Sequence, residues 1–277
     1  MDLISIDMGL SKRGRYKLTL LISLVLAIIG VAVLFVINWS LIIQAFQSYE
    51  GAFEVLLVIS IRILILSIIA FYLFHKWFKQ EAQYLSDIPF LLGLFFLILI
   101  FGKAIDLLWD LTFFTFNDDI VLLFLKFRFF IIIFEVAPLI YLGMEIIFFR
   151  LEDRFNKLKD KGYMNRLRNI LISVIILIEL IAIITGPNLT MMGIILPLIL
   201  IPSLLGIVYI FYMAYSLNRL TIVKPGILTI SFFLYMLSNI FRPIMQNILG
   251  ETASYIIVVE IVDIIIFMII FLGLYKK

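Results

Sequence analysis

Long apolar runs separated by short polar connections restrict this chain to a narrow class of folds. Most of the runs reach the length of about 20 apolar residues that an α-helix needs to cross a bilayer. We therefore predict an all-α, polytopic transmembrane helical bundle that forms one integral membrane domain over residues 1–277. We expect eight spans, which cover residues 18–39, 52–74, 88–109, 120–149, 170–185, 191–217, 226–249 and 254–275.

Composition excludes the main alternatives to a membrane protein. The chain is 64% hydrophobic and 15% charged, whereas soluble domains are about 45–50% apolar and about 25% charged. It has no cysteine and one histidine, His75, which stands at the end of an apolar run beside Lys76 and Trp77. Disulfides and zinc sites built from Cys and His are therefore excluded. We expect no metal and no cofactor.

The basic residues outside the apolar runs predict the orientation of the chain. They occur before the first run, in alternate connections and after the last run, while the other connections contain no Lys or Arg. Cytoplasmic loops carry the Lys/Arg excess, so we predict a multi-pass protein of the cell membrane with both termini in the cytoplasm. The residues concerned are Lys12, Arg13, Arg15, Lys17, Lys76, Lys79, Arg150, Arg154, Lys157, Lys159, Lys161, Arg166, Arg168, Arg219, Lys224, Lys276 and Lys277.

The longest polar connection, Arg150–Arg168, is a candidate contact surface on the cytoplasmic side. Leu151, Phe155 and Leu158 follow a helical spacing among its basic residues. Such a segment can lie on anionic lipid or bind a cytoplasmic protein. The alternative is a solvated loop whose charges only determine topology. The positive charge follows from topology, and we expect no nucleic-acid partner.

Charged and amide side chains inside the apolar runs are the candidate site. A charge near the bilayer centre costs at least about 2.5–3.5 kcal/mol, so these groups must face one another or water inside the bundle. Given the predicted orientation, most of them lie in the outer half of the membrane. The candidates for a ligand or ion pathway are Arg62, Lys103, Asp106, Asp110, Lys126, Arg128, Glu135, Glu179, Asn239, Arg242, Gln246, Glu260 and Asp263.

Helical spacing groups these residues into stripes. Lys103, Asp106 and Asp110 share one helix face, as do Asn239, Arg242 and Gln246, Glu260 and Asp263, and Arg128 and Glu135. We expect the stripes to converge, with Arg242 in ion-pair reach of Asp106, Glu260 or Asp263. Convergence permits two interpretations: a hydrated pocket that opens to the outside, which we favour, or dry ion pairs that hold the helices together.

The sixth run has no charge but contains two prolines. Pro197 and Pro202 each remove a backbone hydrogen bond and so kink or interrupt a helix. Broken helices line solute paths in transporters, which makes these prolines hinge candidates. A static kink in a packing helix is the alternative.

Three function classes fit these features. A transporter or permease-type protein that moves or binds a small solute or ion explains the mixed-charge interior and the proline-rich run. An outward-facing ligand sensor that signals through a cytoplasmic partner explains the outer position of the charges. An intramembrane enzyme acting on lipid-linked substrates is the third class, but no catalytic residue stands out. We favour transport and do not expect an enzyme.

Overall fold

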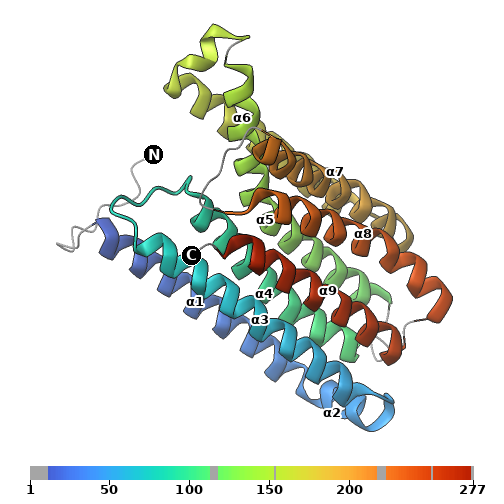
Figure 1. The fold of residues 1–277 in the computed structure, drawn as a ribbon. Helices are drawn as coiled ribbons and strands as arrows, with labels where there is room; N and C mark the ends of the chain where they lie inside the picture. Colours follow the sequence, from blue (N-terminus) through green and yellow to red (C-terminus); the bar gives the residue numbers. More distant parts are fainter. Residues whose placement is uncertain (1–11, 113–117, 153, 217–222, 251, 276–277) are drawn as a thin grey trace.

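The structure, a computed structural model, describes residues 12–112, 118–152, 154–216, 223–250 and 252–275. In these ranges the chain is helical and has no strand, which confirms the all-α prediction (Figure 1). The helices are α1 (Lys12–Ile37), α2 (Trp39–Ser48), α3 (Ala52–Phe78), α4 (Ile88–Thr112), α5 (Asp118–Leu151), the 3-10 helix η2 (Asn156–Lys159), α6 (Lys161–Thr185), α7 (Leu189–Ser216), α8 (Pro225–Leu249) and α9 (Ala253–Leu274).

Six helices in the described ranges are long and apolar enough to cross a membrane: α1, α3, α4, α6, α8 and α9. The protein is therefore a multi-pass membrane protein. Helices α5 and α7 are the longest, with 34 and 28 residues, and pack within the same bundle. The start of α1 and the end of α9 lie at the same end of the bundle (Figure 1). Eight spans and cytoplasmic termini agree with this arrangement but remain predictions.

Helix boundaries depart from the apolar runs at two places. Helix α6 begins at Lys161, well before the apolar run at residue 170, because the Asp160 side chain accepts a hydrogen bond from the Gly162 amide and caps the helix. The helix that holds the fifth predicted span, residues 170–185, is therefore 25 residues long. Helix α2 was not predicted. It follows α1 directly and buries Ile42 and Ala45, which are three residues apart on one face.

Six helices close into a ring. In order of contact, α3 packs on α4, α4 on α5, α5 on α7, α7 on α8, α8 on α9, and α9 back on α3. Helix α1 lies outside this ring and buries none of its apolar window, and α6 packs on α5 and α7 with most of its surface exposed. The ring has an interior to which several helices contribute side chains, and α1 and α6 are peripheral.

Aromatic side chains fill the interior of the ring near the end at which α1 begins. We define the aromatic layer as Phe95, Phe96, Phe211, Phe232 and Phe267, all of them fully buried. The rings of Phe211 and Phe232 stack with centroids 5.4 Å apart, and Phe96 meets Phe267 edge-on at 5.9 Å. All five residues lie at a similar depth. At 1.5 Å per residue, each is about 10 Å along its helix from the end on the predicted cytoplasmic side. The aromatic layer therefore fills part of the ring interior on the predicted cytoplasmic side.

Candidate functional site

Two carboxylates of α9 occupy the centre of the ring. Glu260 accepts hydrogen bonds from Arg62 on α3 at 2.7 Å and from Lys103 on α4 at 2.8 Å. Asp263 lies one turn further along α9 and pairs with the same Arg62 at 2.8 Å. Arg242 on α8 also pairs with Asp263 and lies 3.7 Å from Glu260. The predicted reach of Arg242 to α9 is confirmed.

A second set of pairs extends this cluster to α5. Asp106 on α4 accepts from Lys103 at 3.0 Å and from Arg128 at 2.5 Å. Arg128 Nη1 also lies 3.5 Å from Glu135 Oε2, seven residues further along α5. We define the charge network as Arg62, Lys103, Asp106, Arg128, Glu135, Arg242, Glu260 and Asp263. It joins five of the six ring helices, and α7 alone contributes none of these residues.

The network is dry at its centre and partly exposed at its rim. Arg62, Lys103, Glu135, Glu260 and Asp263 are at most 3% exposed. The side chains of Asp106, Arg128 and Arg242 are 19%, 16% and 25% exposed. The centre therefore matches the interpretation as dry ion pairs, while the rim leaves charged groups open to an approaching solute.

The depth of the network follows from helix positions. Apart from Glu135, its members lie about 9–15 Å along their helices from the end opposite the aromatic layer, at 1.5 Å per residue. Glu135 is deeper. The guanidinium of Arg62 lies over the ring of Phe267, with its Cζ 5.0 Å from the centroid, so the network rests directly on the aromatic layer.

Several supporting residues were missed at the sequence level. Ser238 donates a hydrogen bond to Asp263 at 2.7 Å, and Tyr255 donates to the Arg242 carbonyl at 3.2 Å. Ser238 lies four residues before Arg242, so the polar stripe on α8 could have revealed it. A Cβ on Gly102 would lie 2.8 Å from Arg128 Nη1. The missing side chain lets Arg128 approach α4, and nothing in the sequence marks that role.

Two other candidates lie close to the network. Asp110 is half-buried on α4, one turn from Asp106. No ion pair of Asp110 within 4.0 Å occurs in the described part of the chain. The Asn239 amide donates to the Tyr235 carbonyl of its own helix at 2.8 Å, so Asn239 adds a polar surface and no interhelical bond.

The remaining candidates are not brought into the network. Lys126 donates to the Ile184 carbonyl at 3.1 Å, between α5 and α6. Glu179 is half-buried on the peripheral helix α6. Pro202 is exposed on α7, which is one helix from Leu189 to Ser216, and its predicted role as a kink or hinge stays a prediction. The side chains of Gln246 and Pro197 lie outside the described set.

The Arg150–Arg168 segment is only partly the exposed basic surface that its composition suggests. Arg168 is 4% exposed, and its guanidinium lies over the ring of Tyr141 at 3.9 Å. Leu158 is buried, whereas Phe155 is 54% exposed. Arg168 therefore binds the bundle itself, and lipid or protein contact at the rest of the segment stays a prediction.

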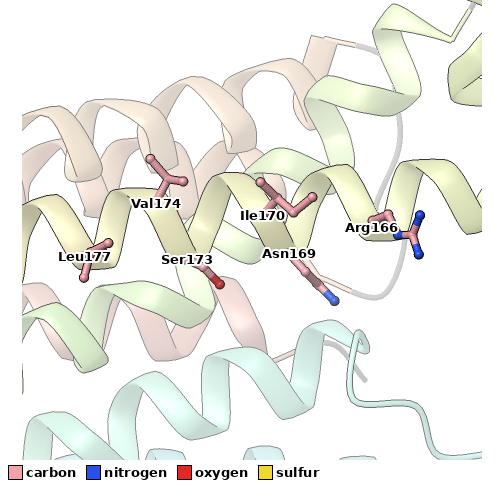
Figure 2. A pocket seen from close by; sticks show the side chains of 6 residues that line it. All are labelled: Arg166, Asn169, Ile170, Ser173, Val174 and Leu177. Atoms are coloured by element: carbon pink, nitrogen blue, oxygen red, sulfur yellow. The ribbon is translucent and has the colours of Figure 1, made fainter. Parts of the chain in front are cut away.

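Neither of the two cavities described here is lined by the network. One, of about 530 Å³, is a groove along α6 lined by Arg166, Asn169, Ile170, Ser173, Val174 and Leu177. Figure 2 shows these side chains along a single helix, with Asn169 and Ser173 pointing to the same side. The other, of about 380 Å³, lies at the turn between α2 and α3. An outward-opening pocket at the network therefore stays a proposal.

No family model, curated protein or solved structure matches this chain.

Proposed function

We propose that this protein is a membrane transporter or permease-type protein whose charge network binds a small charged solute or ion inside the helix ring. The observation that carries the proposal is the convergence of oppositely charged side chains from five helices in the interior of a membrane bundle. Such groups are expensive to bury and typically mark solute or ion pathways.

The rim of the network supports a solute that enters from the outer side. Asp106, Arg128 and Arg242 are partly exposed, while their partners beneath are dry. A solute that bears both charge signs, or either one, could exchange partners with these rim groups without leaving a buried charge uncompensated. The aromatic layer beneath would then be the barrier that must open for passage to the cytoplasm.

A ligand sensor is the second candidate, and the same aromatic layer favours it. A binding site closed on its inner side by stacked rings can report an external ligand without passing it on. Signalling would then require a cytoplasmic protein at the exposed part of the Arg150–Arg168 segment, where Phe155 is 54% exposed.

Binding followed by uptake tests the proposal. Purified protein is screened for thermal stabilisation by the common amino acids, dicarboxylates, polyamines, inorganic phosphate, Na⁺ and K⁺. A stabilising solute is then offered, radiolabelled, to proteoliposomes. We expect uptake that Arg242→Gln abolishes and Lys126→Gln preserves, because Lys126 is a membrane cation outside the network.

The outcomes separate the two candidates. Stabilisation that depends on Arg242, without uptake into proteoliposomes, would replace transport by sensing. Stabilisation that both variants retain would place the binding site away from the network and would contradict the proposal.

A further inference from the structure

The formal charges in the ring interior do not balance. Four cationic side chains, Arg62, Lys103, Arg128 and Arg242, form the ion pairs of the network with four carboxylates. Asp110 is a fifth carboxyl, because it follows Lys103 and Asp106 on the same face of α4, one turn beyond Asp106. Fully ionised, these side chains would carry one excess negative charge at the outer side of the ring interior, where a partly buried charge without a counter-ion is unfavourable.

Two of the five carboxyls are poorly paired. Asp110 has no ion pair within 4.0 Å in the described ranges, and it is half-buried near the rim. Glu135 is 2% exposed, and its Oε2 lies 3.5 Å from Arg128 Nη1. Both of these atoms lack a hydrogen bond to any described residue. The other three carboxylates each have a partner at 3.0 Å or less.

The surroundings of the two carboxyls are otherwise mixed in charge. Asp110 is acted on by Lys103 and Asp106 of its own helix, by Arg242 of α8 and by Glu260 of α9. Glu135 is acted on by Arg128 of its own helix, Asp106 of α4, Arg62 of α3 and Tyr235 of α8. Two more helices pack on α5: α7 has no charged residue, and α6 carries Lys161, Arg166, Arg168 and Glu179.

We propose that the ring interior holds one exchangeable proton, carried by Asp110 and Glu135 as alternative sites. The proton enters from water on the outer side, bonds to a carboxyl oxygen and leaves by the same route. It removes the excess negative charge in either position. Within the proposed function it would be the coupling ion, but its presence does not depend on transport.

A metal cation fits this position less well than a proton. Among the residues described, no group of three or more His, Asp or Glu side chains could hold a metal ion. A metal ion bound at Glu135 would keep its positive charge beside the guanidinium of Arg128, whose Nη1 lies 3.5 Å from Glu135 Oε2. A proton needs only one oxygen and converts the carboxyl to a neutral donor.

The charge count predicts the behaviour of single variants. Asp110→Asn and Glu135→Gln each leave four carboxyls for four cations, so either change should abolish the network proton wherever it resides. Lys103→Met leaves five carboxyls for three cations and should add a second proton. Lys126→Gln and Glu179→Gln alter charges outside the network and should leave its proton in place.

Infrared spectroscopy of the purified protein in nanodiscs tests this without a solute. The C=O stretch of protonated carboxyls, identified by its shift in D₂O, is compared between variants near neutral pH. We expect the intensity of this band to fall by one carboxyl in Asp110→Asn and in Glu135→Gln. It should rise by one carboxyl in Lys103→Met and stay unchanged in Lys126→Gln. Glu179→Gln removes at most the contribution of its own side chain.

Two results would overturn the inference. If neither variant loses intensity, the network holds no proton. If only one variant does, that carboxyl is protonated independently of the network charge. Thermal melting verifies that each variant is folded, and Asp110→Ser replaces Asp110→Asn if the latter does not fold. Absence of solute uptake would contradict the proposed function and leave the infrared result unchanged.

Discussion

Arg62 on α3 and Glu260 on α9 form a buried ion pair 2.7 Å long although 198 residues separate them in the sequence. The pair closes the ring, because α9 returns to pack on α3. Asp263 shares the same guanidinium at 2.8 Å. Helices α3 and α9 are thus joined both by apolar packing and by a cluster of charges in which Glu260 and Asp263 share one arginine.

Removing Arg62 should destabilise the protein strongly. Arg62→Leu leaves Glu260 and Asp263 short of one cation in a dry environment, and breaking such a pair costs about 3–5 kcal/mol. We expect a clearly lower melting temperature in detergent. Adding Glu260→Gln should recover part of the loss, since a neutral pair is often tolerated. A Lys126→Met control should melt near the wild-type temperature. An equal fall in melting temperature for Arg62→Leu and Lys126→Met would contradict the special role of Arg62.

Gly102 should be intolerant of even a methyl group. In Gly102→Ala the new Cβ would meet Arg128 Nη1 at 2.8 Å and its Cζ at 3.0 Å. Arg128 would have to shift from Asp106, and overpacking of this kind costs about 1–3 kcal/mol. Gly206→Ala is the matched control, because nothing lies within 4 Å of its Cβ position. Thermal melting should separate the two variants, and identical melting would show that Arg128 can move freely.

The aromatic layer should act as the inner barrier. Phe232 is fully buried and stacks on Phe211 with the ring planes 5° apart. Phe232→Ala removes that contact and leaves a cavity, at a cost of about 3–5 kcal/mol. We expect faster leakage of protons through proteoliposomes that contain this variant, measured with an entrapped pH-sensitive dye. Leakage at the wild-type rate from folded Phe232→Ala protein would place the barrier elsewhere.

The orientation predicted from the basic residues can be tested directly. The chain contains no cysteine, so single substitutions give clean labelling sites. In intact cells an impermeant thiol reagent should label Pro187→Cys, which is exposed in the turn after α6, but not Lys159→Cys in η2. Labelling becomes possible at Lys159→Cys only after the cells are opened. Labelling of Lys159→Cys in intact cells would reverse the predicted topology.

The long apolar helices and the membership of the polar stripes could be predicted from the sequence, whereas the short helix α2 was missed. Apolar runs determine which segments become helices, since a chain in lipid must satisfy its backbone hydrogen bonds internally. The spacing of Lys103, Asp106 and Asp110, or of Glu260 and Asp263, places those side chains on one face regardless of the neighbours. Charges too costly to expose to lipid must turn inward, which anticipated the pairing of Arg242 with α9.

Which partners meet was decided only by the tertiary structure. Helical periodicity determines a face and cannot say that α9 packs on α3, so the Arg62–Glu260 pair was not predictable. For the same reason Lys126 looked like a member of the network but donates to the Ile184 carbonyl instead. Gly102 matters because it has no side chain at the place where the guanidinium of Arg128 approaches α4. Such a fit depends on how closely two helices approach, and the packing of the whole ring sets that distance.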